Sequence, residues 1–334
     1  MAYFCNRSSY FLSRKKQSLA ENIVLIDGFS SSGKSLVSAI FGYLERSEQW
    51  QMDDTCEHVS ILNYLNEISN ESAKGFILSK IDKLLYNLSI GRYVNFRKLD
   101  QSSPYFDGLE EKYKNRLLEK DTEKVIRKIK ETKPILPIHL HFIFGYNNLL
   151  FDVFGDKLKL YLIVLRNPFY LIDRWHDGMW VNRICNNDRE FNLCLKYEDE
   201  EIPWYTIDYA SKYIKASEIE KSILTIFNFF TRVFDMYEKQ TIYNKKKIMI
   251  VNFEDFISKP NFFVDNFCKI LSTKRNDSFN QIMKKLTLPR EQNENEINYK
   301  SFIEKYQISL SNEYIEILDK LNFRYESFKE KIKS

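Results

Sequence analysis

Residues 22–46 contain an apolar run, a glycine- and serine-rich loop and an amphipathic segment in direct succession, and this order restricts the fold more than any other feature. The run Asn22–Asp27 (NIVLID) is short, apolar and β-branched, which is typical of a strand buried on both faces. From about Gly33 to Arg46, apolar residues recur at helical spacing. Between them, Gly28–Ser35 (GFSSSGKS) matches the pattern G-x-x-x-x-G-K-[ST]. Strand, loop and helix in this order predict a phosphate-binding loop.

The chemistry of such a loop follows from its small residues. They let the backbone curl so that its N–H groups point at one anion, and the start of the following helix adds a partial positive charge. Lys34 can reach phosphate oxygens, and Ser35 can bind magnesium or an oxygen. A plain Gly/Ser-rich turn with a surface lysine is the alternative, which the flanking strand and helix disfavour. The residues expected to surround the anion are Ser30, Ser31, Ser32, Gly33, Lys34 and Ser35.

Further strands and helices alternate along the chain. Apolar runs predict strands at 135–142, 159–165 and 248–253, and helical spacing predicts helices at about 168–175, 217–239, 260–271 and 310–332. This alternation predicts a three-layer α/β/α fold with a central, mostly parallel sheet, like that of P-loop nucleoside triphosphate hydrolases. We expect a single domain over 22–330, with a helical insertion at about 50–130, a surface insertion or lid at 186–215 and a flexible N-terminal arm at 1–21.

Composition narrows the classes of partner and compartment. Of 334 residues, 44% are hydrophobic, which is enough for a sizeable core, and the net charge of +4 is too small to indicate nucleic acid or a membrane surface. The five cysteines are scattered without a CxxC pair, so a structural zinc site has little support and a reducing compartment is the simpler interpretation. The N-terminal stretch lacks an apolar region typical of a secretory signal, and charges interrupt the apolar stretch 219–237. The sequence therefore predicts a cytoplasmic protein without a transmembrane segment.

A basic residue follows the strand expected at 159–165. Arg166 lies at its carboxyl end, and Asn167-Pro168 then begins a helix. Open α/β sheets bind ligands at this edge, so Arg166 predicts a second anion in the same crevice. Two separated anion sites suit a nucleotide with phosphates at both ends. An ATP or GTP hydrolase would usually end a second strand in an acidic residue that binds magnesium. The pair Glu254-Asp255 comes late in the chain, so it could bind magnesium only if the strand order allowed it.

Taken together, these segments resemble the sulfotransferase family, whose donor is 3′-phosphoadenosine 5′-phosphosulfate. Gly28–Ser35 looks like the family's 5′-phosphosulfate loop. Lys159–Pro168 (KLYLIVLRNP) is similar to its strand-Arg-Asn-Pro segment, and Ile248–Phe256 followed by Lys259-Pro260 is similar to its late strand, Glu-Asp pair and Pro-capped helix. The resemblance covers about 22–46, 135–180 and 245–325.

The resemblance also implies roles for single residues. Ile138-His139-Leu140 resembles the Thr-His-Leu of the cytosolic branch, so His139 would be the base that deprotonates the acceptor hydroxyl, a task suited to a group titrating near neutrality. His141 lies on the same face of the predicted strand and is a rival. Arg166 would bind the donor's 3′-phosphate. Arg174 stands where the family has a serine, and it could either bind that phosphate bidentately or pair with a neighbouring aspartate, Asp173 or Asp177.

The sequence departs from the family pattern in the loop and near the C-terminus. The family's basic loop residue corresponds to Ser31, and Lys34 stands where the family has Thr or Ser. Either Lys34 stabilises the charge that develops on the bridging oxygen, or the loop serves a different nucleotide. The family's Arg-Lys-Gly segment has no match, and Lys300 is the candidate substitute.

The sequence thus predicts a sulfotransferase that moves a sulfuryl group from 3′-phosphoadenosine 5′-phosphosulfate to a hydroxyl acceptor, with saccharide, lipid and small alcohol all open. His139 and Lys34 are its expected catalytic residues, and no metal is expected. An ATP- and magnesium-dependent P-loop kinase and a non-catalytic nucleotide-binding module are the alternatives.

Overall fold

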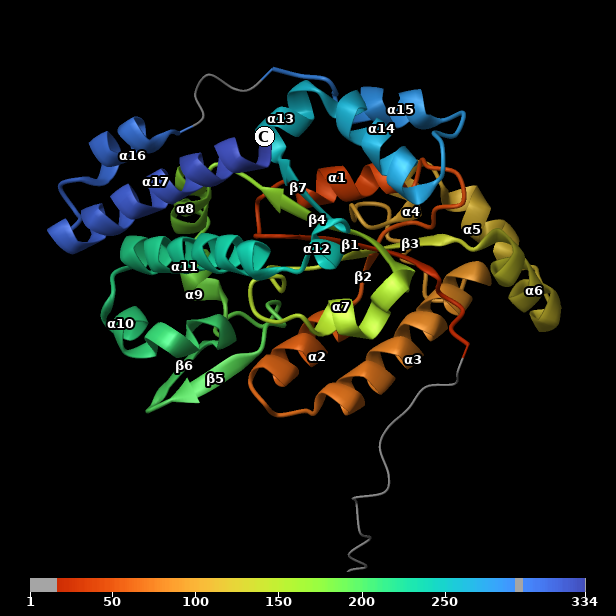
Figure 1. Cartoon of the computed structure of the whole chain (residues 1–334), viewed down its shortest axis with the longest axis horizontal. Helices are drawn as coiled ribbons and strands as arrows, with labels where there is room; N and C mark the ends of the chain where they lie inside the picture. The colour runs from red at the N-terminus through yellow and green to blue at the C-terminus, as the bar shows by residue number, and fades with distance from the viewer. Residues whose placement is uncertain (1–16, 292–296, 334) are drawn as a thin grey trace, which may run out of the picture.

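Five parallel strands form one sheet in the order β2-β3-β1-β4-β7 (Figure 1). The computed structural model describes residues 17–291 and 297–333. The strands are β1 (Asn22–Gly28), β2 (Gln51–Met52), β3 (Ile135–His139), β4 (Leu158–Leu165) and β7 (Ile248–Asn252). The predicted α/β class and parallel sheet are confirmed.

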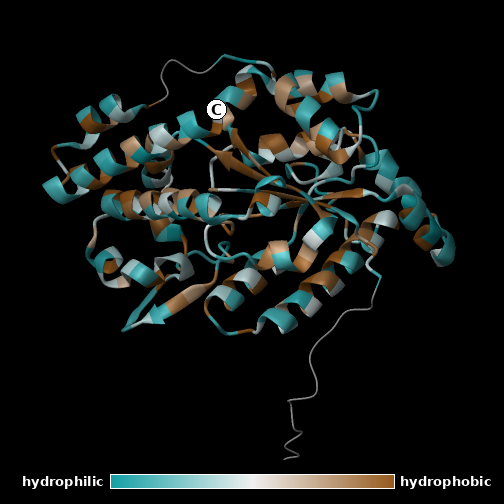
Figure 2. Cartoon of the chain, in the orientation of Figure 1, coloured by the Kyte–Doolittle hydropathy of each residue, from teal (hydrophilic) through white to brown (hydrophobic). Residues whose placement is uncertain are grey.

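Helices cover both faces of this sheet, as the figures show (Figures 1 and 2). In β1, Val24 and Ile26 point to one face, and Ile23 and Leu25 to the other. The first face packs against α1 (Lys34–Phe41), α13 (Phe253–Ser258), α14 (Pro260–Leu271) and α15 (Phe279–Lys285). The second packs against α2 (Asp54–Tyr64), α3 (Asn70–Ser89), α7 (Leu149–Phe154), α8 (Pro168–Asp177), α11 (Glu218–Lys239), α16 (Tyr299–Tyr306) and α17 (Asn312–Lys333). Burial on both sides explains why β1 is a continuous apolar run.

The remaining elements lie outside these layers or join them. They are α4 (Pro104–Asp107), α5 (Glu110–Arg116), α6 (Thr122–Thr132), α9 (Trp180–Arg183), α10 (Ala210–Lys215), α12 (Ile242–Lys245), β5 (Cys194–Tyr197), β6 (Glu200–Pro203) and the 3₁₀ turns η2 (Gly155–Lys157) and η3 (Trp204–Tyr209). The segment 50–130 contains the helices α2 to α6, and its first residues form β2 at the edge of the sheet, whereas its status as an insertion stays a prediction.

Two predicted elements end earlier than their patterns suggested. β3 stops at His139 instead of 142, because Phe142 adopts a left-handed backbone conformation (φ 45°) that an extended strand cannot contain. α1 stops at Phe41, and the chain then turns back to place Ser47 beside Ile135 at the start of β3. The strand therefore ends before His141, but the rings of His139 and His141 still lie together, with their centroids 5.2 Å apart.

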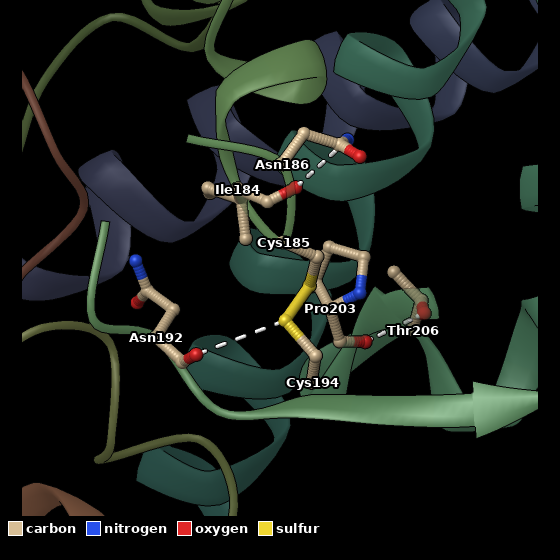
Figure 3. Close-up of a disulfide and its surroundings, with 7 residues drawn as sticks. All are labelled: Ile184, Cys185, Asn186, Asn192, Cys194, Pro203 and Thr206. Atoms are coloured by element: carbon tan, nitrogen blue, oxygen red, sulfur yellow. Dashed lines mark hydrogen bonds between the residues drawn. A yellow bond between two sulfur atoms is a disulfide. The ribbon is translucent and has the colours of Figure 1, made fainter. Parts of the chain in front are cut away.

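The segment 186–215, predicted to be irregular, contains an antiparallel hairpin, β5–β6, followed by η3 and α10. A disulfide joins Cys185, just after α9, to Cys194 at the start of β5 (Figure 3). The sequence did not predict this bond, which runs against the reducing compartment inferred from the scattered cysteines. The Cα atoms are 5.9 Å apart although the two residues are 9 positions apart in sequence, because the intervening turn folds back onto β5. The cytoplasmic compartment, which rested on those cysteines, stays a prediction.

The N-terminal arm is described only in its last residues. Residues 1–16 lie outside the described residues, whereas the backbone N–H groups of Leu19 and Ala20 donate to the Asp82 carboxylate of α3. The proposed limits of a single domain stay a prediction. Over 17–291 and 297–333, no helix combines the length and the apolar character that crossing a membrane requires.

Candidate functional site

The loop between β1 and α1 has a shape that only glycine permits at two positions. Gly33 has φ 88°, and a Cβ there would lie 2.2 Å from the Phe253 ring. A Cβ on Gly28 would lie 2.6 Å from the carbonyl oxygen of Val164 in β4. The pattern glycines therefore allow the loop to pack closely against β4 and against α13.

Lys34, the first residue of α1, is buried with 4% of its surface exposed, and its Nζ donates to the carbonyl of Phe29 over 3.2 Å. Burial lowers the pKa of Lys34 to about 8, against the opposing attraction of the Asp27 and Glu57 carboxylates. An anion beside this ammonium group would favour its charged form. The charge of Lys34 therefore depends on whether an anion lies beside it.

Asp27 fixes the framework around the loop. Its carboxylate accepts hydrogen bonds from the backbone N–H groups of Gly28 and Phe144, each over 2.7 Å, and from the Tyr161 hydroxyl over 3.0 Å. Burial raises the pKa of Asp27, and these donors act in the opposite direction. Asp27 therefore ties the segment after β3, which carries His141, to the start of the loop.

Arg166 follows β4, the strand beside β1, and its side chain is held by rings and by the loop. The guanidinium lies over the Tyr170 ring at 3.5 Å from its centroid and over the Phe253 ring at 4.5 Å, and its Nη1 donates to the Ser31 carbonyl over 3.3 Å. Asn167 caps α8, with its side-chain oxygen accepting from the N–H of Phe169 over 2.9 Å. The strand-Arg-Asn-Pro segment thus brings a guanidinium to the mouth of the loop.

A cavity of about 310 Å³ joins the loop to α8. It brings together most of the predicted binding residues and adds aromatic and amide side chains from other elements. Its lining residues are Ser31, Gly33, Lys34, Ser35, Leu36, Gln101, Arg166, Tyr170, Arg174 and Phe253. Ser30 and Ser32 are absent from this lining. The Ser30 carbonyl accepts from Trp175 Nε1 over 3.4 Å, and the Ser32 hydroxyl is buried with no hydrogen-bond partner in the part of the chain that the structure describes.

Arg174 reaches the cavity from α8 with its side chain exposed. The two candidate carboxylate partners are engaged elsewhere, since Lys305 Nζ lies 2.7 Å from Asp173 and 3.9 Å from Asp177. Within the described ranges, no ion pair joins Arg174 to either of them. Lys300, the other cationic candidate, is exposed on α16 and is not among the lining residues.

The two candidate bases have different surroundings. His139 is 1% exposed, its Nδ1 lies 3.1 Å from the Ser38 hydroxyl of α1, and its ring packs on Trp50 with the centroids 4.9 Å apart. Burial, together with the nearby Lys34 charge, lowers the pKa of His139 well below its usual value. His139 therefore stays neutral inside the core between β3 and α1.

His141 is accessible and paired with a carboxylate. Its side chain is 27% exposed, and its Nδ1 lies 2.8 Å from Oε1 of Glu57 in the first turn of α2. The Glu57 carboxylate also acts on the charge of Lys34, so the pair faces the same edge of the sheet as the loop. Sequence reasoning missed Glu57 because β2, which positions α2, is only two residues long.

The strand order settles where the acidic pair Glu254-Asp255 lies. The neighbours of β1 are β3 and β4, which end at His139 and just before Arg166, whereas the acidic pair follows β7 at the sheet's edge. Glu254 Oε1 accepts from the N–H of Asn167 over 3.0 Å, so it supports the Arg166 segment. In the described part of the chain, no group of three His, Cys, Asp or Glu side chains is arranged to hold a metal ion.

Comparisons with known proteins return sulfotransferase structures. No family model and no curated protein matches the chain. A sulfotransferase domain from the curacin biosynthetic pathway is similar with a TM-score of 0.44 and 10% identity, covering 90% of this chain and 97% of that one. A sulfotransferase domain from the Synechococcus PCC 7002 olefin synthase has a TM-score of 0.39 and 10% identity (92% and 97% covered), and a sulfotransferase from Mycobacterium avium has 0.39 and 8% (87% and 76% covered).

Proposed function

We propose that this chain is a sulfotransferase that transfers a sulfuryl group from 3′-phosphoadenosine 5′-phosphosulfate to a hydroxyl acceptor. The observation that carries the proposal is the shared cavity, in which Lys34 and Ser35 of the loop lie opposite Arg166 and Arg174 of the β4–α8 segment. A nucleotide with anions at both ends matches two cationic groups of different origin better than a linear triphosphate does.

The residues of the chain divide the chemistry between them. The loop and Lys34 would hold the 5′-phosphosulfate and stabilise the charge that appears on the leaving phosphate, and Arg166 and Arg174 would hold the 3′-phosphate. His141 would take the proton of the acceptor hydroxyl as the new S–O bond forms and the S–O bond to the phosphate breaks. Glu57 would orient the ring and stabilise the imidazolium. His139, predicted from the resemblance as the base, would support the site as a buried neutral ring.

A kinase using magnesium-ATP is the first alternative, because Lys34-Ser35 completes the triphosphate-loop pattern. Thermal stabilisation separates the two, since a ligand that binds only the folded state at 100 times its Kd adds about 2.7 kcal/mol to the free energy of unfolding. We expect adenosine 3′,5′-bisphosphate to raise Tm without magnesium. Stabilisation by magnesium-ATP alone would overturn the sulfotransferase proposal.

A nucleotide-binding module without catalysis is the second alternative. The test is transfer of labelled sulfuryl from the donor to a panel of saccharide, lipid and small-alcohol hydroxyls. We expect turnover with at least one class, lost in His141→Ala and in Lys34→Ala. Donor binding without transfer to any of the three classes would favour the module, and it would leave the assignment of the nucleotide intact.

A further inference from the structure

A second cavity, larger than the first, lies at the opposite end of the sheet. Its volume is about 520 Å³, and it is bounded by α5, α6, the end of α3 and the turn between α1 and β2. Figure 1 shows α5 and α6 at the right, whereas α8, which follows Arg166, lies at the left. The proposed sulfuryl-transfer site makes no use of this cavity. Its lining residues are Arg46, Glu48, Ser89, Lys112, Asn115, Arg116, Glu119, Lys124, Val125, Lys128, Ile129, Thr132 and Pro134.

The lining is strongly cationic. It holds five Arg or Lys side chains against two carboxylates, a net charge of +3 around one cavity. Both carboxylates are already neutralised by close partners. Glu48 accepts from Arg116 Nη1 over 2.7 Å and Nη2 over 2.9 Å, and Glu119 lies 2.7 Å from Lys124 Nζ. The excess positive charge therefore faces the cavity without a matching anion of its own lining.

Three cations carry that excess, namely Arg46, Lys112 and Lys128. Lys112 Nζ donates to the Ser47 carbonyl over 2.8 Å and lies 3.7 Å from the Glu48 carboxylate that Arg116 already holds. Arg46 contributes its charge only, because its Nη1 and Nη2 donate to four backbone carbonyls, those of Thr132, Lys133, Leu271 and Ser272. Lys128 is exposed on α6, one turn from Lys124. These groups come from three separate segments and converge on one space, which distinguishes them from a solvated helix face.

The cavity also has an apolar wall. Val125 and Ile129, on the buried face of α6, and Pro134, before β3, are part of the lining. A cation cluster beside an apolar wall matches an organic molecule with one anionic group and a less polar body. A bare inorganic ion would use only the cations, and its volume is far below that of the cavity.

We propose that this second cavity binds a small organic phosphate or sulfate ester, with its anionic group on Lys112 and Lys128 near the Arg46 charge, and its body against Val125 and Ile129. Phosphate and sulfate esters share the tetrahedral anionic head that such a cluster recognises. Burial lowers the pKa of Lys112, and the nearby Glu48 carboxylate acts in the opposite direction. The site is separate from the loop and needs neither Lys34 nor Arg166.

The test uses two probes, p-nitrophenyl phosphate and p-nitrophenyl sulfate, with neutral p-nitrophenyl glucoside and inorganic phosphate as comparisons. Calorimetric titration at low salt is performed on the full chain and on Lys34→Ala, which disables the loop. We expect one or both esters to bind Lys34→Ala, the better one identifying the head group. Lys128→Glu should weaken this binding at least 10-fold, whereas Lys130→Glu, on the same helix but outside the lining, should leave it unchanged.

Several results would overturn this inference. They are loss of ester binding in Lys34→Ala, equal binding by Lys128→Glu and Lys130→Glu, no ester binding at all, or inorganic phosphate or the neutral glucoside binding as tightly as the esters. Circular-dichroism melts of each variant establish that it is folded, so a loss of binding reports on the site. None of these outcomes depends on sulfuryl transfer, and failure of the transfer assay would leave the second cavity's assignment untouched.

Discussion

At the scale of single residues, the pKa of Lys34 links its burial to the binding of an anion. Its pKa is lowered to about 8 by burial, so above that pH the folded protein without ligand holds Lys34 largely uncharged, whereas the unfolded chain keeps it protonated up to about 10.5. The cost of burying the charge is therefore present below pH 8 and disappears between these two values. A bound anion replaces that cost with an attraction and raises the pKa again.

Nucleotide binding should consequently take up a proton between about pH 8 and 10, and almost none at pH 6. The measurement is calorimetric titration of adenosine 3′,5′-bisphosphate at pH 9 in buffers with different ionisation enthalpies. We expect the apparent enthalpy to vary with the buffer in the wild type and not in Lys34→Met. Equal proton uptake in Lys34→Met would show that another group titrates.

Substitution of the two histidines should change different quantities, kcat for His141 and the free energy of unfolding for His139. His141→Ala should lower kcat about 10²- to 10⁴-fold, the usual contribution of a general base, with a small change in the free energy of unfolding because its ring is partly exposed. Glu57→Gln should lower kcat less. His139→Ala should instead destabilise the fold, because it empties space between Trp50 and Ser38. The assignment fails if His139→Ala folds but loses turnover while His141→Ala keeps it.

At the scale of elements, the sequence predicts long or strongly patterned pieces and misses short ones. β1 and β4 were predictable because burial on both faces makes each an apolar run, β7 because it is a short apolar run, and α8 because Pro168 follows Asn167 at its start. β2 has two residues and no pattern of its own, so Glu57 could not be placed beside His141 from sequence. The Arg166 stack on Tyr170 and Phe253 joins residues far apart in the chain and requires the sheet order.

The loop should not tolerate a side chain at Gly33. Gly33→Ala combines a left-handed backbone (φ 88°) with a Cβ 2.2 Å from the Phe253 ring. Backbone strain alone costs roughly 1–2 kcal/mol, and the overlap adds about 1–3 kcal/mol. Denaturant unfolding measures both, with Gly108→Ala as a control of similar φ (71°) whose nearest neighbour is 3.8 Å away. Equal losses for the two variants would mean that the Phe253 contact is unimportant.

The Cys185–Cys194 bond should stabilise the segment that carries the β5–β6 hairpin. Closing a short loop of this length stabilises the folded state by about 2–3 kcal/mol relative to the reduced chain. The oxidised wild type should therefore unfold at higher denaturant than its reduced form, and Cys185→Ser/Cys194→Ser should match the reduced form. Cys268→Ser, at a free cysteine, is the control. Identical curves for oxidised and reduced wild type would contradict a structural role for the bond.

At the scale of the whole molecule, the sheet order is what creates the site. β1 and β4 are parallel neighbours, so their carboxyl ends meet at one edge and bring the loop and Arg166 to one cavity, although β2, β3 and the helices α1 to α7 intervene in sequence. Phe253, the first residue of α13 directly after β7, is part of the same lining. The loop, the Arg166 segment and the segment after β7 therefore each contribute lining residues to this one cavity. The second cavity lies at the other end of the same sheet, which keeps the two anion sites apart.

A ligand that spans this edge should gain affinity that its halves lack. We expect adenosine 3′,5′-bisphosphate to bind about 10- to 100-fold more tightly than adenosine 5′-phosphate, the equivalent of one or two charge-assisted hydrogen bonds. In Arg166→Ala this ratio should fall to a few-fold, since the 3′-phosphate loses its partner while the 5′-phosphate keeps the loop. Arg189→Ala, an exposed arginine outside the cavity lining, should keep the wild-type ratio. If Arg166→Ala weakens both ligands equally, Arg166 supports the loop through Ser31 without touching the 3′-phosphate. The proposal that the two phosphates of one nucleotide are bound at separate cationic groups would then be wrong.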